Sequence, residues 1–125
     1  MLAKISVMVA VHQRLGVALV VVAAVGAILG FLGAARGGPS PALRVFARLT
    51  TLVFAIQVVA GLLLLASGHR PGASLHYVYG AAALLAVPVG IAAGARGDAR
   101  REAWALCLGL LAATLIAARA VGTGG

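Results

Sequence analysis

The sequence predicts an all-α integral membrane protein, folded as a four-helix bundle with up-down-up-down topology. Of its 125 residues, 63% are hydrophobic and only 10% are charged, whereas a soluble domain carries about 25% charged residues. The apolar residues fall into four runs, each long enough for the roughly 20 helical residues that cross a hydrocarbon core. The sequence lacks the strand alternation of a membrane barrel, so helices are the expected way to satisfy the backbone in lipid. The lipid bilayer is therefore the first partner that the composition implies.

The four expected spans cover residues 7–35, 45–66, 74–95 and 103–118, within a single domain of residues 1–125. The first apolar segment is too long for the core of a signal peptide. The breaks between spans are short and rich in glycine, proline and polar residues, which favour turns. Because all three connections are short, helices adjacent in sequence are expected to pack antiparallel.

The connections also contain signals for individual helix ends. Residues 36–41 read Arg-Gly-Gly-Pro-Ser-Pro and end the first helix, and residues 67–72 read Ser-Gly-His-Arg-Pro-Gly and separate the second helix from the third. The third break is Arg96-Gly97-Asp98, in which Asp98 is expected to cap the last helix.

The net charge of +8 would suggest nucleic acid in a soluble protein. This chain has no soluble surface for such a partner, and its basic residues sit mostly in loops. The first and third loops and their flanks hold six arginines: Arg36, Arg44, Arg48, Arg96, Arg100 and Arg101. The other side holds four basic residues: Lys4, Arg14, Arg70 and Arg119. The positive-inside rule then places both termini and the second loop outside. The high content of alanine, glycine and arginine suggests a bacterial source, and hence the bacterial plasma membrane.

Small residues within the spans are interpreted as packing. The lone Cys107 lies in the fourth span, where a buried thiol is usually inert. Gly26 with Gly30, and Gly90 with Gly94, have the four-residue spacing that lets membrane helices approach closely.

Two histidines occupy equivalent places in helices that run the same way. His12 lies a few residues into the first span, and His76 a few residues into the third. At 1.5 Å rise per residue, both are expected within about one turn of the same depth. The first and third helices of a four-helix bundle are diagonal, so the two imidazoles can approach a common centre. This arrangement suits a haem iron with one histidine on each side.

A glycine follows each of these histidines after four residues, Gly16 after His12 and Gly80 after His76. Residues at this spacing share a helix face. A glycine there removes the side chain that would collide with a flat macrocycle.

Two of the other polar residues, Gln57 and Arg14, each allow two interpretations. Gln57 is either a residue of the haem pocket or a hydrogen-bond partner of another helix. Arg14 is either a surface residue whose long side chain reaches the membrane interface or a partner for a haem propionate. His69, Tyr77 and Tyr79 are interpreted as interfacial residues.

Four segments carry a resemblance to a known family: His12-Gln13-Arg14-Leu15-Gly16, Gln57 with Gly61, Ser67-Gly68 and Leu75-His76. Over about residues 9–96, the chain is similar to one four-helix half of the haem A synthase family. Each half in that family carries one histidine on its first bundle helix and one on its third. The resemblance therefore implies that His12 and His76 are haem ligands. Other membrane cytochromes of the b type share this geometry.

The resemblance is closer to the half of that family that holds haem b as a cofactor. The catalytic half carries a glutamate three residues before its first histidine, where this chain has Val9. It often has a cysteine pair in an outer loop, whereas this chain has one cysteine in all.

Three functions follow as hypotheses. The first is a small b-type cytochrome that binds one haem b between His12 and His76 near the outer face and transfers single electrons, either as a homodimer or within a larger respiratory membrane complex. The second is a haem-modifying protein similar to haem A synthase that acts with a partner or as a homodimer. The third is a cofactor-free structural subunit of a membrane complex. Electron transfer is favoured over stand-alone enzymatic activity, and no catalytic residue is assigned.

Overall fold

A computed structural model describes residues 2–124, and over these residues the chain forms four α-helices without β-strands. They are α1 (Leu2–Ala35), α2 (Pro41–Ala66), α3 (Leu75–Gly94) and α4 (Ala99–Gly124). All four are long and apolar enough to cross a membrane. The predicted all-α four-helix class and the multi-pass membrane character are confirmed.

The helix ends follow from local chemistry. The side chain of Ser40 accepts a hydrogen bond from the Leu43 amide at 3.1 Å and caps α2. Asp98 accepts one from the Arg101 amide at 2.8 Å, which confirms its predicted role as the cap of α4. These side chains satisfy amides that the first turn of a helix leaves unpaired.

Two glycines end α1 and α2 in the same way. Gly37 has φ 101° and Gly68 has φ 88°, a left-handed conformation that glycine adopts without a steric penalty. After Gly37, the amide of Gly38 donates to the carbonyl of Gly33 at 2.8 Å. After Gly68, the amide of His69 donates to the carbonyl of Leu64 at 2.9 Å. Both ends therefore close with the backbone bonds of a Schellman motif.

Three helices are longer than the predicted spans. α1 begins at Leu2 rather than residue 7, and α2 begins at Pro41 rather than residue 45. α4 covers Ala99–Gly124 rather than residues 103–118. The expected limits marked the ends of apolar runs, but a polar residue such as Arg119 does not break a helix. The last turn of α4 is also tied to the connection before α3, because the Ala73 amide donates to the Thr123 carbonyl at 3.0 Å.

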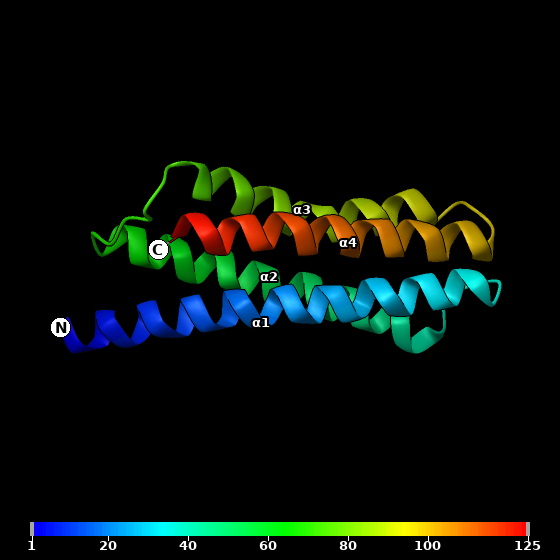
Figure 1. The fold of residues 1–125 in the computed structure, drawn as a ribbon, viewed down its shortest axis with the longest axis horizontal. Coiled ribbons are helices and arrows are strands. Elements are labelled where there is room, and N and C mark those ends of the chain that lie inside the picture. The colour runs from blue at the N-terminus through cyan, green and yellow to red at the C-terminus, as the bar shows by residue number, and fades with distance from the viewer. Residues whose placement is uncertain (1, 125) are drawn as a thin grey trace.

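The helices run alternately up and down, as the short connections predicted (Figure 1). Both termini and the α2–α3 connection lie at one end of the bundle, here called the termini end. The α1–α2 and α3–α4 connections lie at the other, here called the loop end. α4 packs extensively against α1 and α3, whereas α2 makes fewer contacts with its two neighbours. α1 and α3 are therefore diagonal, and α2 is the least tightly held helix.

Glycines allow α4 to approach both of its neighbours. A Cβ atom added to Gly30 of α1 would lie 2.8 Å from Cα of Cys107. One added to Gly90 of α3 would lie 2.7 Å from the carbonyl oxygen of Ala105. Cys107 itself is buried. The predicted packing roles of Cys107 and the glycine pairs are confirmed.

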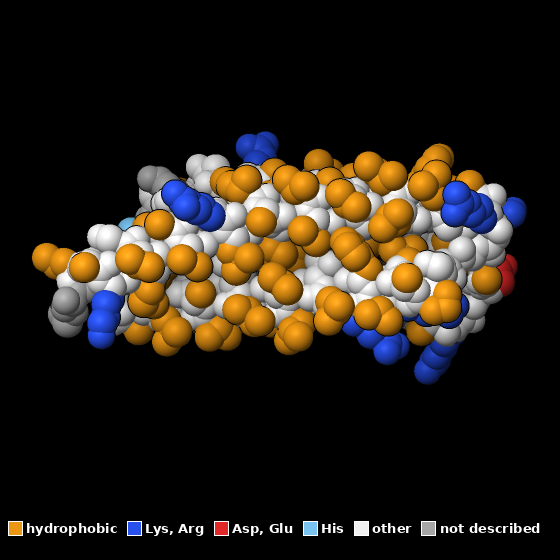
Figure 2. All heavy atoms as spheres, turned by 90° about the horizontal axis from the view of Figure 1, so that it is seen from below, with side chains coloured by type: hydrophobic (Ala, Val, Ile, Leu, Met, Phe, Trp, Pro, Cys, Tyr) orange, Lys and Arg blue, Asp and Glu red, His pale blue; other side chains and the backbone are white. Residues whose placement is uncertain are grey.

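The face of the molecule seen in Figure 2 is apolar along the middle of the bundle and basic toward its ends. Large hydrophobic side chains are exposed on every helix, for example Val21, Ile56, Leu85 and Leu108. Exposed apolar side chains on all sides suit contact with lipid. At the loop end, Arg44 of α2 makes a two-pronged ion pair with Glu102 of α4, at 2.7 and 2.8 Å.

Candidate functional site

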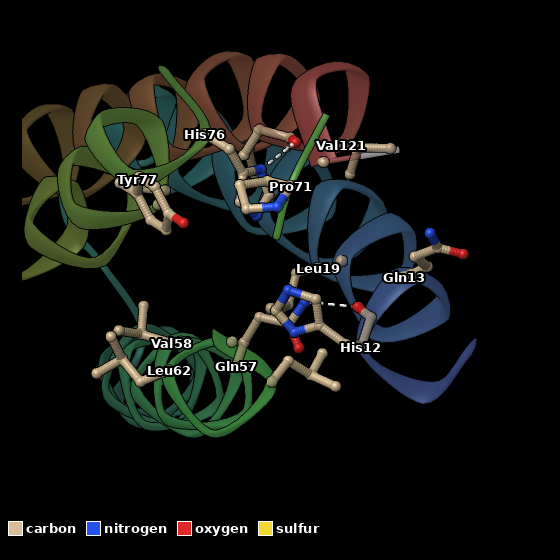
Figure 3. Close-up of a pocket in the computed structure, with 18 of the residues that line it drawn as sticks. His12, Gln13, Leu19, Gln57, Val58, Leu62, Pro71, His76, Tyr77 and Val121 are labelled. Carbon is tan, nitrogen blue, oxygen red and sulfur yellow. Dashed lines mark hydrogen bonds between the residues drawn. The ribbon is translucent and has the colours of Figure 1, made fainter. Parts of the chain in front are cut away.

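A pocket of about 520 Å³ lies between the four helices at the termini end (Figure 3). Its walls are mainly apolar and include residues of all four helices, among them Leu19, Phe54, Val58, Leu62, Ala83 and Val121. The polar side chains at the pocket are His12, Gln13, Gln57, His69, His76 and Tyr77. A pocket of this size falls within the range of about 300–1,000 Å³ that is usual for small-molecule and cofactor sites.

The structure brings His12 of α1 and His76 of α3 together across the bundle. Their ring centroids are 6.1 Å apart, and the ring planes are inclined at 76°. Both side chains are partly buried and line the same pocket. The two residues are 64 positions apart in the sequence (76 − 12), and the antiparallel course of the helices returns them to one level.

A contact with α4 determines which ring nitrogen of His76 carries a proton. Its Nδ1 lies 2.7 Å from the backbone carbonyl oxygen of Ala120. A carbonyl oxygen can only accept, so Nδ1 carries the proton and donates it. In the neutral imidazole, Nε2 then keeps a free lone pair, the form in which histidine binds metals. The Thr123 hydroxyl lies 3.4 Å from the same Nδ1 atom.

Gln57 of α2 is bonded to the backbone of His12. Its Nε2 donates to the carbonyl oxygen of His12 at 2.6 Å, so the interhelical hydrogen bond considered from the sequence is present. The amide also faces the pocket, so Gln57 fits both of its predicted roles. Two buried atoms at this contact have no hydrogen-bond partner within residues 2–124: Nδ1 of His12 and Oε1 of Gln57.

Glycines make room for both imidazoles. A Cβ atom on Gly61 of α2 would lie 3.1 Å from Cε1 of His12. One on Gly124 of α4 would lie 2.9 Å from Cε1 of His76. Each ring therefore packs against the backbone of a neighbouring helix.

Gly16 and Gly80, the glycines that follow the two histidines after four residues, both line the pocket, but their surroundings differ. A Cβ atom on Gly80 would meet nothing within 4 Å, so Gly80 leaves open space. One on Gly16 would lie 3.3 Å from Nε2 of Gln57, so Gly16 mainly lets the amide approach α1. Of the pair, Gly80 is the one that widens the cavity.

Three further polar residues, Arg14, His69 and Tyr77, differ in their position relative to the pocket. Arg14 is exposed and does not line the pocket, which favours its interpretation as a surface residue. His69 and Tyr77 do line it, in addition to the interfacial position predicted for them. In Figure 3, the Tyr77 side chain of α3 and the Val58 and Leu62 side chains of α2 stand on opposite sides of an opening.

Sequence reasoning missed the contribution of α4. The carbonyl of Ala120 and the backbone of Gly124 position His76, yet both residues lie beyond the predicted end of the fourth span. No sequence signal marks a carbonyl acceptor, because every residue has one.

The chemistry of the site rests on nitrogen donors. Among residues 2–124, no group of three or more histidine, cysteine, aspartate or glutamate side chains is arranged to hold a metal ion. Protein zinc sites use three or four such ligands. Two imidazoles instead suit a metal that arrives with its other ligands already bound. No known protein family, curated protein or solved structure matches the chain significantly, so the functional argument rests on these residues.

Proposed function

We propose that this protein is a membrane-embedded b-type cytochrome that binds one haem b between His12 and His76 and transfers single electrons. The observation that carries the proposal is the 6.1 Å separation of two imidazole centroids inside a largely apolar pocket. The haem, when bound, supplies a one-electron iron couple.

The spacing of the rings fits two ligands on opposite sides of one iron. An imidazole nitrogen binds a metal at about 2.0–2.1 Å and lies about 1.2 Å from its ring centroid, so two opposed rings have centroids about 6.4 Å apart. The rings of His12 and His76 are within a few tenths of an ångström of that separation. The separation of the two rings therefore supports their binding of one shared metal ion.

The pocket walls suit a flat apolar macrocycle. Gly80 leaves open space beside His76, and the side chains of Val58, Leu62 and Ala83 provide apolar walls. Burial of a haem in such a site is one of the ways in which a protein tunes the redox potential of the haem.

Electron transfer is better supported than haem modification. The chain has two acidic side chains in all, Asp98 and Glu102. Both lie at the loop end, away from the pocket at the termini end, and Glu102 is paired with Arg44. Among the described residues, the pocket therefore has no carboxylate side chain to act as a general base. A partner subunit or a second copy of this chain would have to supply one.

We assign the site to the outer side of a bacterial plasma membrane. The loop end contains six of the ten basic residues, and the positive-inside rule places such an end in the cytoplasm. The pocket and both termini then face outward, where a donor or acceptor outside the cell membrane can exchange electrons with the site. A homodimer or a larger respiratory complex would be a suitable setting.

The test is an absorption spectrum of the protein purified in detergent after expression with haem available. The wild-type protein should show a low-spin Soret band and a sharp α-band after reduction with dithionite. Both His12→Ala and His76→Ala should lose this spectrum. His69→Ala is the matched control, because His69 also lines the pocket but lies on the α2–α3 connection, and it should keep the spectrum.

A colourless wild-type protein that takes up no added haem would overturn the proposal. A spectrum that survives both substitutions would do the same, since the iron would then have other ligands. In either case the cofactor-free structural subunit becomes the better interpretation.

A further inference from the structure

Gln57 and His12 contain the two buried side-chain atoms that lack a hydrogen-bond partner among the described residues. They are Oε1 of the amide and Nδ1 of the imidazole. The two residues are already joined, because Nε2 of Gln57 donates to the His12 backbone carbonyl at 2.6 Å. An unpaired buried polar group is costly, so two of them in joined residues require an explanation.

The orientation of the amide follows from this hydrogen bond. A backbone carbonyl can only accept, so the amide nitrogen of Gln57, not its oxygen, must face the His12 carbonyl. Oε1 is then left as an acceptor that needs a donor. The Nδ1 atom of His12 can be that donor only if it carries the ring proton.

We propose that Gln57 is a positioning residue that holds His12 as the tautomer protonated on Nδ1, by accepting that proton with Oε1. The proposal rests on the proposed function, because its consequence is a free lone pair on Nε2 of His12 for the iron. Gln57 thus acts through His12 and has no direct role at the metal.

The other histidine is held in the same form by a different group. The Ala120 carbonyl of α4 accepts the proton on Nδ1 of His76. With Gln57 on α2 acting on His12, both imidazoles present Nε2 as the free donor atom. Partners of this kind fix the tautomer and orientation of metal-binding histidines, and their loss typically weakens metal binding about 10–100-fold.

The first experiment measures the tautomer in the haem-free protein. Nitrogen-15 NMR of protein with labelled histidine, in detergent micelles at a pH where the imidazoles are neutral, distinguishes protonated from unprotonated ring nitrogens. The wild type should show Nδ1 protonated on both His12 and His76. Gln57→Leu should lose this preference at His12 alone, and the unchanged His76 signal reports that the bundle is still folded.

One further variant separates positioning from general support of the helix contact. Thr51→Val is the matched control, because Thr51 lies on the same helix, bonds only to the Ala47 carbonyl of its own helix and is not among the pocket residues. It should leave the His12 signals unchanged.

Haem titration then gives the functional consequence. Gln57→Leu should bind haem about 10–100-fold more weakly than the wild type, and Thr51→Val should bind it equally well. A His12 tautomer that is the same in the wild type and Gln57→Leu would overturn the proposal. A Gln57-dependent tautomer in a protein that takes up no haem would instead overturn the proposed function and still support this role of Gln57.

Discussion

At the scale of single residues, the two imidazoles of the site are supported by different kinds of group. His76 depends on a backbone carbonyl, which a side-chain substitution at Ala120 cannot remove. The backbone carbonyl of His12 accepts a hydrogen bond from the side chain of Gln57, and the same side chain, which a single substitution can remove, is proposed to hold the imidazole. The His12 side of the site is therefore the one more easily altered by mutation.

Gly80 gives a direct test of whether the cavity is the binding site. Gly80→Phe places a large ring in the open space beside Gly80 and should abolish haem uptake. Gly80→Ala adds one methyl group where no atom lies within 4 Å. It should weaken haem uptake less than Gly80→Phe does, and it should raise the stability of the haem-free helix by about 0.5–1 kcal/mol. Haem titration and thermal unfolding in detergent measure both effects.

Full haem uptake by Gly80→Phe would show that the ligand binds elsewhere. The folded state of this variant should be checked by circular dichroism, since only a folded protein makes the comparison meaningful.

Gly61 tests the contact between α2 and the His12 ring. A Cβ atom in Gly61→Ala would lie 3.1 Å from Cε1 of His12, so the ring must shift by a few tenths of an ångström. We expect weaker haem binding and a shifted Soret band, without loss of the fold. Gly122→Ala is the control, because its Cβ atom would meet nothing within 4 Å. Identical spectra and affinities for the two variants would contradict the expected contact.

At the scale of helices, α4 is the element around which the bundle is organised. It contacts α1 and α3 along their lengths and supplies the fully buried side chain of Leu110. Its last turn also binds His76 and the α2–α3 connection. Since lipid provides no hydrophobic driving force between helices, this close packing is a main source of stability.

A substitution at Gly90 tests how much the close packing of α3 against α4 contributes to the free energy of unfolding. Gly90→Ala would bring a Cβ atom to 2.7 Å from the carbonyl oxygen of Ala105, so α3 and α4 must move apart. We expect a loss of about 1–3 kcal/mol in the free energy of unfolding, as for other overpacked interiors. Thermal unfolding in detergent, compared with Gly122→Ala, gives the measurement. A stability equal to that of the control would mean that α3 and α4 are not in close contact at this position.

α2 is expected to be the helix most free to move, because it makes the fewest contacts with the other helices. One wall of the pocket and the amide of Gln57 both belong to it. Adjustments of the pocket to a bound ligand are therefore expected to involve α2 more than α4. At the loop end, its ion pair with Glu102 is exposed and contributes little in salt solution.

At the scale of the whole molecule, the bundle is asymmetric along its axis. The pocket and all three histidines lie at the termini end. Six of the ten basic residues and both acidic side chains lie at the loop end. This polarity links the orientation in the membrane to the side on which the site operates.

The orientation can be tested by labelling single cysteines. In a Cys107→Ala background, Ser67→Cys reports the termini end and Ala95→Cys the loop end, and both positions are exposed. A membrane-impermeant maleimide added to intact bacterial spheroplasts should label Ser67→Cys only, and Ala95→Cys should react only after the membrane is opened. The reverse pattern would place the site on the cytoplasmic side.

The sequence by itself determined the class of protein and the course of the chain. Four apolar runs with short connections leave a helical membrane bundle as the expected fold, because lipid cannot satisfy an unpaired backbone. The same pattern placed His12 and His76 at one level, since residues equally far into parallel helices lie at equal depth. The glycine pairs and the Asp98 cap were also predictable, because each is marked by its spacing or its position in the sequence.

Only the tertiary structure decided what surrounds the two imidazoles. The rotation of each helix about its axis brought the rings to 6.1 Å, placed Gly80 beside open space and turned Gly16 toward Gln57. It also showed that α4 continues past residue 118 and holds His76 through a carbonyl. A sequence specifies depth through helix length, but contacts between helices depend on how all four surfaces pack at once, and a backbone acceptor carries no mark in the sequence.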